Sequence, residues 1–184
     1  MVPETRTPVS IEEFWHLAHC LPKAELVAGQ VIELVPPGAR HGFLVAALIQ
    51  RLREHVAVHD LGIVLADAGF VLSTDPPTVR APDISVVLRA RVPSPLPVKF
   101  FSGPSDLAVE VLSPDDRPAE VAAKLADYLR AGSQGVWVID PEAQTATVHT
   151  RQGAITYRLD ETLRGAPPLP DFTLPLPDLF PAFL

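Results

Sequence analysis

The stretch Leu107-Ala-Val-Glu-Val-Leu112 is an apolar β-strand pattern that carries a single charge, Glu110. Side chains alternate along a strand, so Leu107, Val109 and Val111 share one face and Glu110 lies on the other. A carboxylate buried in such a strand costs several kcal/mol unless it meets a cation, a proton or solvent. Glu110 is therefore either a site residue or a water-facing side chain in an edge strand, where exposed carboxylates are common.

Helices and further strands are predicted on both sides of this stretch. Ser10 and Glu13 form a capping box that begins a short helix, and apolar residues at helical spacing predict a long helix over 41–58. Another helix is expected over 117–131, with Gly132 as its end. The expected strands are 24–28 and 31–35, joined as a hairpin around Gly29, and 63–65, 70–72, 84–88, 136–139, 145–149 and 155–159.

Prolines mark the segments between these elements. Pro76 and Pro77 are expected to break the chain, residues 91–105 to form a loop, and the last twenty residues to wrap around the body. Within the loop, Phe100-Phe101 is interpreted as core or partner contact, with base stacking as the alternative. The mixed order of elements predicts an α/β (α+β) fold with a central mixed β-sheet flanked by helices.

Composition narrows the class of protein. The 184 residues, 47% of them hydrophobic, suit a single domain over residues 1–184. Cys20 is the only cysteine, which fits a reducing cytoplasm, and no apolar run is long enough to cross a bilayer. The net charge of −7 argues against a protein that coats nucleic acid, because such binding depends on basic residues, but it does not exclude a nuclease.

Two more carboxylates stand out as lone charges in apolar surroundings. Asp83 follows Pro82 at the start of the strand expected at 84–88, and Glu25 lies within the apolar run Ala-Glu-Leu-Val of the hairpin. For Asp83 alone, a turn-forming Pro-Asp is an equally common explanation. For Glu25 alone, a water-facing side chain is the simpler interpretation.

Lys124 lies at the edge of the apolar stripe of the helix expected over 117–131, and it is one of only three lysines. It either meets a specific carboxylate or covers apolar surface with its stem. Taken together, the residues have a chemical logic. Asp83 and Glu110 on adjacent strands could hold Mg²⁺, or Mn²⁺, which activates water against a phosphodiester, while Lys124 orients that water.

At these residues the sequence resembles the bacterial restriction-endonuclease-like family of the PD-(D/E)XK nuclease superfamily. The resemblance covers nearly the whole chain, from residues 11–14 to 179–180. The stretches that carry it are 24–30 (Ala-Glu-Leu-Val-Ala-Gly-Gln), 80–83 (Arg-Ala-Pro-Asp), 107–114 (Leu-Ala-Val-Glu-Val-Leu-Ser-Pro), 124–128 (Lys-Leu-Ala-Asp-Tyr) and 136–141 (Val-Trp-Val-Ile-Asp-Pro).

The resemblance implies a restriction-endonuclease-like core with an N-terminal β-hairpin. It also implies that Asp83 and Glu110 are the metal-binding acids and that Glu25 joins them in the catalytic site. The superfamily's usual lysine, two residues after the acid, is replaced by Leu112, and the family's helical lysine corresponds to Lys124. The sequence departs from the family pattern in the hairpin, where Ala28 and Gln30 replace the common Asp and Glu. This weakens any claim that further acids surround the site.

The leading functional hypothesis is a metal-dependent endonuclease that hydrolyses DNA phosphodiester bonds. The acidic balance of the chain favours one alternative, a catalytically inactive binding or assembly module on a nuclease fold. A hydrolase of another phosphate ester is the other. A homodimer or higher homo-oligomer is expected, because the proline-rich termini offer apolar surface and small nucleases often pair.

The histidines are expected to have structural or solvent-facing roles. His55 and His59 have the i, i+4 spacing of zinc ligands, but no third ligand is evident, so a solvated helix face is expected. His41 begins the long helix and could lie near the site, although a role at the helix start is expected.

Overall fold

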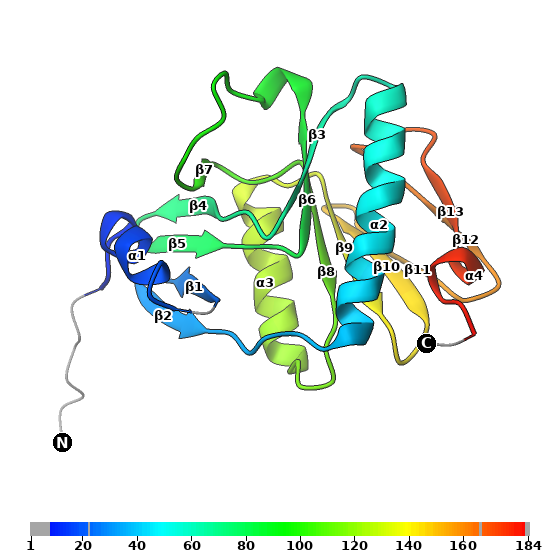
Figure 1. Cartoon of the computed structure of the whole chain (residues 1–184), viewed down its shortest axis with the longest axis horizontal. Coiled ribbons are helices and arrows are strands. Elements are labelled where there is room, and N and C mark those ends of the chain that lie inside the picture. The colour runs from blue at the N-terminus through cyan, green and yellow to red at the C-terminus, as the bar shows by residue number, and fades with distance from the viewer. Residues whose placement is uncertain (1–7, 22, 166, 183–184) are drawn as a thin grey trace.

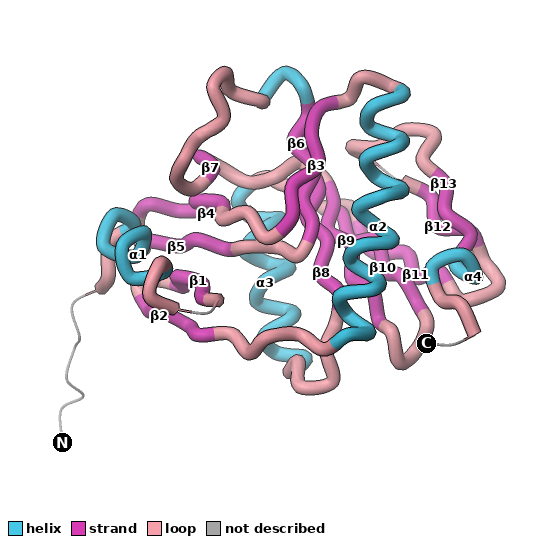
Figure 2. Tube along the Cα trace, in the orientation of Figure 1, coloured by secondary structure: helices cyan, strands magenta, loops and turns pink. Residues whose placement is uncertain are grey.

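The computed structural model describes residues 8–21, 23–165 and 167–182. The described residues form two large β-sheets and a small two-stranded one. The helices α2 (Ala39–Val58) and α3 (Pro118–Ala131) pack against the large sheets (Figure 1). The tube in Figure 2 shows α3 between the strands of the two sheets. The fold is thus a mixed α/β arrangement with an N-terminal hairpin, as the sequence predicts.

The larger sheet has six strands and contains the predicted central strand. Its order is β11 (Gly153–Tyr157), β10 (Thr145–Thr150), β9 (Gly135–Asp140), β8 (Leu107–Val111), β6 (Ile84–Leu88) and β3 (Gly62–Ala66). Strands β8 and β9 are parallel and the other neighbours are antiparallel, so the sheet is mixed. Because β8 lies in the interior of the sheet, the edge-strand interpretation of Glu110 is wrong.

A second sheet, which the sequence does not predict, has five strands. Its order is β2 (Gln30–Glu33), β1 (Ala24–Val27), β5 (Pro77–Arg80), β4 (Phe70–Thr74) and β7 (Phe101–Ser102). Strand β5 begins at Pro77, where a chain break was expected. A proline at the first residue of a strand gives up no essential ladder hydrogen bond, so the strand can start there.

The main core lies between α2 and one face of the six-stranded sheet. The predicted stripe of α2, Leu44, Leu48, Leu52 and Val56, is buried there. The C-terminal segment completes this core through β12 (Thr162–Arg164), β13 (Thr173–Pro175) and α4 (Leu176–Leu179), as Figure 1 shows at the right. Its buried side chains are Leu163, Leu169, Phe172, Leu174, Leu176, Leu179 and Phe180. The proline-rich end therefore contributes core as well as covering the surface.

The opposite face of the six-stranded sheet packs on α3. Tyr128 of α3 clusters with Ala108 of β8 and Val136 of β9, and Leu72 of the smaller sheet contacts the same cluster. Helix α3 thus bridges the two sheets, which places its side chains between β8 and the smaller sheet.

The short elements close the ends of the structure. Helix α1 (Ile11–Ala18) begins at the predicted capping box, and a 3-10 helix, η1 (Arg89–Arg91), follows β6. Phe100 stacks on Phe14 of α1 at a centroid distance of 5.5 Å, and Phe101 packs on Phe70. These rings are therefore core contacts, as predicted. Within the described ranges, no helix combines the length and hydropathy needed to span a bilayer.

Candidate active site

Two adjacent strands of the larger sheet bring Asp83 and Glu110 together. The antiparallel register pairs Ile84 of β6 with Val109 of β8, so one further step sets Asp83 opposite Glu110. Asp83 Oδ2 accepts a hydrogen bond of 2.8 Å from the amide of Val111. Both carboxylates are buried, with 7% and 6% of the residue surface exposed. The structure thus brings these two predicted residues next to each other.

Helix α3 supplies the partners of Glu110. Lys124 Nζ donates to Glu110 Oε2 at 2.9 Å, and the Tyr128 hydroxyl donates to Oε1 at 2.6 Å. The two donors are four residues apart, so they lie on the same face of the helix. Lys124 Nζ also lies 3.8 Å from Glu25 Oε1. The four residues expected from the sequence, Glu25, Asp83, Glu110 and Lys124, therefore converge in one cluster.

Glu25 is held by a buried arginine that the sequence reasoning did not select. Arg80 Nη1 donates to Glu25 Oε2 at 2.8 Å, and the Ala81 amide donates to Oε1 at 3.0 Å. Arg80 also binds Asp127 of α3 through Nε and Nη2, at 3.0 and 2.7 Å. Only 1% of Glu25 is exposed. Because both of its oxygens accept hydrogen bonds from buried protein groups, Glu25 can position the side chains of Lys124 and Arg80.

Asp83 has its own pair of cationic partners. His41 Nε2 lies 3.1 Å from Asp83 Oδ2, and Lys23 Nζ lies 3.5 Å from Oδ1. His41 is in the first turn of α2, as expected. Its ring nevertheless contacts Asp83, so the expectation that it serves only the helix start is wrong. Lys23 precedes β1 and also binds Asp67 at 2.6 Å.

Burial and charge set the proton affinities of this cluster. Burial, together with the negative charges of Asp83 and Glu25, raises the pKa of Glu110 to about 7, although Lys124 and Tyr128 oppose the shift. Burial would lower the pKa of Lys124, but the charges of Glu110, Glu25 and Asp83 outweigh it and raise that pKa. The ammonium therefore stays protonated beside these carboxylates, and Glu110 holds a proton more readily than an ordinary glutamate.

The pKa of Asp83 moves the other way. Burial would raise it, but hydrogen bonds from His41 and the Val111 amide, with the charges of His41 and Lys23, lower it below its usual value. The hydrogen bond to Asp83 in turn raises the pKa of His41. Asp83 is thus the firmly ionised acid of the pair.

Four further residues contribute to the cluster: Lys23, Arg80 and Tyr128, which were not selected as site residues from the sequence, and His41, for which a role at the helix start was preferred. A local signal existed for two of them: Tyr128 is one helical turn after Lys124, and Arg80 is three residues before Asp83. The other two depend on elements far away along the chain, and no local pattern marks them.

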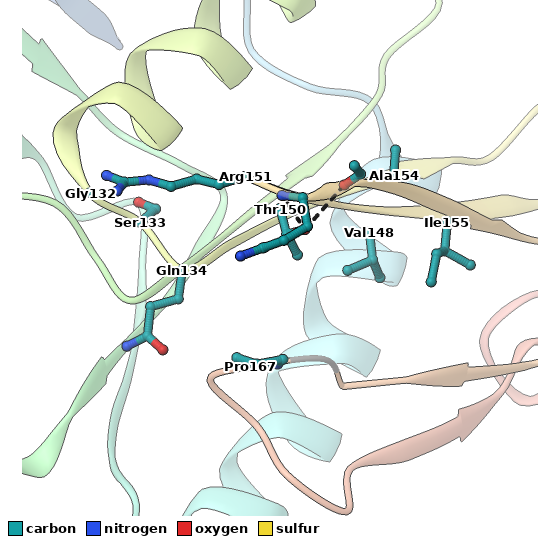
Figure 3. A pocket seen from close by; sticks show the side chains of 11 residues that line it. Gly132, Ser133, Gln134, Val148, Thr150, Arg151, Ala154, Ile155 and Pro167 are labelled. Carbon is teal, nitrogen blue, oxygen red and sulfur yellow. Dashed lines mark hydrogen bonds between the residues drawn. The ribbon is translucent and has the colours of Figure 1, made fainter.

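Two hollows lie at opposite ends of the parallel pair β8–β9. A hollow of about 390 Å³ borders the cluster and is lined by His41, Arg40, Leu112, Pro114 and Asp140, among others. A hollow of about 600 Å³, shown in Figure 3, lies beside Ser133 and Gln134, just before β9 begins. No acid lines this second hollow among the described residues. Among the described residues of the cluster, His41 lines the smaller hollow.

His55 and His59 lie outside the cluster. His55 bonds the carbonyl of Pro170 at 3.0 Å and is partly buried, while His59 is exposed. Throughout the described part of the chain, no group of three or more His, Cys, Asp or Glu side chains is arranged to hold a metal by itself.

Comparisons with known proteins agree with this fold. Residues 11–178 match the family model described as "Uma2: Putative restriction endonuclease". The fold is similar to a crystal structure at 1.96 Å resolution of "a putative nuclease belonging to DUF820" from Anabaena variabilis ATCC 29413. That likeness has a TM-score of 0.81 at 23% identity and covers 94% of this chain and 98% of the other. A search of curated proteins gave no match.

Proposed function

The chain belongs to the Uma2 family, described as "Putative restriction endonuclease", and on this premise we propose that it is a Mg²⁺-dependent endonuclease of the PD-(D/E)XK type that hydrolyses DNA phosphodiester bonds. The observation that carries the proposal is the convergence of Asp83, Glu110 and Lys124 in one cluster, in which His41, the partner of Asp83, lines a hollow. Buried acids with perturbed pKa values, gathered next to a lysine, are typical of catalytic sites. The proposal assigns Asp83 and Glu110 to the metal.

The residues present fit a magnesium ion. Mg²⁺ is usually held by one or two carboxylates and keeps several waters, so a complete protein cage is not required. Glu110 has its pKa raised to about 7 by burial first and then by the negative charges of Asp83 and Glu25. An added divalent cation would compensate them. Mn²⁺ accepts the same oxygen ligands and is proposed as an alternative ion.

Each side chain has a role that its contacts support. A bound Mg²⁺ would polarise the phosphate and make a bound water more acidic. Lys124 keeps its protons and can donate to an attacking water or to the charge that builds on the phosphate. Glu25 lies 3.8 Å from the Lys124 ammonium and is itself held by Arg80. This buried pair therefore helps to position Lys124. Tyr128 holds the Glu110 carboxylate in place.

DNA as substrate and a homodimer as the active form are parts of the same proposal. Pairing would set two sites against the two strands of a duplex. The apolar residues of the C-terminal segment are buried in the core of the chain, so they do not support a homodimer. The proposal of a homodimer is based on the match between two sites and two DNA strands.

The test is plasmid cleavage by the purified full chain with Mg²⁺, Mn²⁺ or EDTA. Wild-type protein should nick or cut DNA only with metal, and Asp83→Asn and Glu110→Gln should each lower the rate at least about a hundredfold. Asp178→Asn is the matched control, because Asp178 is an exposed acid paired with Arg51. Cleavage that survives both site substitutions would overturn the proposal.

The same assay separates the alternatives. A protein that binds metal but hydrolyses only a small phosphate ester, such as p-nitrophenyl phosphate, is a hydrolase of another class. A protein that hydrolyses neither substrate under any metal condition is an inactive binding module.

A further inference from the structure

The two oxygens of Asp83 have different surroundings. Oδ2 accepts the Val111 amide at 2.8 Å and faces His41 Nε2 at 3.1 Å. Among the described residues, Oδ1 meets only the ammonium of Lys23, at a distance of 3.5 Å. A cation that binds Asp83 therefore has one accessible oxygen, and that oxygen already faces a positive charge of the protein itself.

Lys23 is held on its other side by Asp67. The ammonium lies 2.6 Å from Asp67 Oδ1, closer than to Asp83. Asp67 follows β3, and its amide donates to the backbone carbonyl of Asp83 at 3.3 Å, so the two acids flank the same lysine. Asp67 and Lys23 differ in exposure, with 60% and 24% of the side chain accessible. The shorter contact shows which acid holds the ammonium more closely.

We propose that Lys23 is an internal competitor for the divalent metal at Asp83 and that Asp67 sets the metal affinity by holding the Lys23 ammonium aside. This inference rests on the proposed metal site. An ammonium is a compact point charge that occupies the same carboxylate oxygen a metal needs, and like charges at such separations repel strongly. When the ammonium turns fully onto Asp67 and gives up its 3.5 Å contact with Asp83, Oδ1 is open to a metal. Without Asp67, the ammonium is free to bind Asp83 fully.

Lys23 is distinct from Lys124 in this respect. Lys124 is paired with Glu110 and Glu25, and these contacts orient it within the site. Lys23 has a solvent-exposed acid as its nearer partner, so its ammonium can turn away from Asp83 without leaving a charge unpaired. That difference makes Lys23 the residue that tunes the affinity.

The experiment is Mg²⁺ and Mn²⁺ titration of the DNA-free full chain, by calorimetry for Mg²⁺ and by the electron paramagnetic resonance signal of free Mn²⁺. Lys23→Met should lower the Kd by about tenfold, because it removes a positive charge from the ligand oxygen. Asp67→Asn should raise the Kd severalfold. The double variant should stay closer to Lys23→Met than to wild type, because Asp67 acts through Lys23.

Lys99→Met provides the matched control, since Lys99 also pairs with a single exposed acid, Glu12, at 2.5 Å. It should leave the Kd unchanged. A double variant that returns to the wild-type Kd would show that the two residues act only as independent charges, and it would overturn the inference. An unchanged Kd in Lys23→Met would overturn it as well.

The failure of this inference can be told apart from failure of the proposed function. If wild-type protein binds neither metal, or if Asp83→Asn binds as well as wild type, the metal site itself is wrong. If wild type binds metal through Asp83 and the Lys23 and Asp67 variants bind alike, only the competition is wrong. Circular dichroism of each variant establishes that it is folded, and both side chains are accessible enough for the substitutions to be tolerated.

Discussion

The ammonium of Lys124 lies 2.9 Å from Glu110 Oε2, although the two residues are 14 apart in the sequence. Glu110 lies near the end of β8, and α3 runs back along the sheet so that its second turn reaches the same carboxylate. The contact keeps a buried acid ionisable, and under the proposed function it places a permanent cation beside the metal-binding acids. Under that proposal a lysine two residues after Glu110 is unnecessary, and Leu112, which directly follows β8, can take that position.

Replacing Lys124 by Met should destabilise the protein most at alkaline pH. Glu110 and Glu25 would then be left in a buried space without their shared cation, which typically costs about 3–5 kcal/mol. At pH 5 Glu110 takes up a proton, so the loss of stability should be smaller than at pH 8. Urea unfolding at both pH values measures it. Lys99→Met, which breaks an exposed pair, should cost less than about 1 kcal/mol at either pH.

Glu110→Gln should become relatively more stable than wild type as the pH rises. The pKa of Glu110 is raised from 4.5 to about 7 on folding, so its contribution to stability is complete below pH 4.5 and is lost as the pH rises to 7. Glutamine has no such loss. The difference in unfolding free energy between variant and wild type should shift by about 2 kcal/mol in favour of the variant between pH 5 and pH 8 without metal.

Constant effects of the substitution cancel in that comparison, because only its change with pH is used. The titration of His41 is common to both proteins and cancels as well. A pH-independent difference would show that Glu110 is ionised throughout the range.

The sequence was informative where a signal is local. Apolar spacing predicts α2 closely, with an expected range of 41–58 against the observed Ala39–Val58. A lone Glu in an apolar strand identified the central carboxylate, because burial of an unpaired charge is costly wherever the strand lies. The same logic applied to Glu25 and to Lys124 at the margin of its stripe.

The sequence was uninformative where long-range pairing decides the structure. Leu26 of β1 pairs with Val79 of β5, and no local pattern announces a partner so distant in the chain. The second sheet and strand β5 were missed for that reason. Arg80 was missed as a site residue, and His41 was given a role at the helix start, for the same reason: each meets an acid on another element.

Tyr128→Phe should shift the pH dependence of cleavage to higher pH. The Tyr128 hydroxyl lowers the pKa of Glu110 by its hydrogen bond, so its removal should raise that pKa further above its usual value. The rate should then reach half its maximum at a higher pH. Loss of a donor to a buried carboxylate should also cost about 1–3 kcal/mol of stability at pH 8.

Tyr157→Phe is the control for that prediction, because Tyr157 is partly buried and its hydroxyl bonds no described residue. It should leave the pH profile in place. Equal profiles for wild type and Tyr128→Phe would contradict a role of the hydroxyl in setting the proton affinity of Glu110.

Arg80→Met should be among the most destabilising single substitutions in the site. It leaves the carboxylates of Glu25 and Asp127 without their shared guanidinium, and breaking such a buried network costs about 3–5 kcal/mol. Arg130→Met removes a second partner of the same Asp127, but 75% of the Arg130 side chain is exposed. That control should cost less than about 1 kcal/mol. Similar losses in both variants, measured by urea unfolding, would refute the central role of Arg80.

Mg²⁺ should stabilise the wild-type protein more at pH 8 than at pH 5.5. Metal ligands must be deprotonated, and at pH 5.5 Glu110 still holds its proton, because its pKa is about 7. The rise in melting temperature on adding Mg²⁺ should therefore grow through neutral pH, and it should be lost in Glu110→Gln. Sodium chloride at matched ionic strength controls for general screening of charge. A rise in melting temperature that is equal at both pH values would mean that the metal binds through the already ionised Asp83 without Glu110.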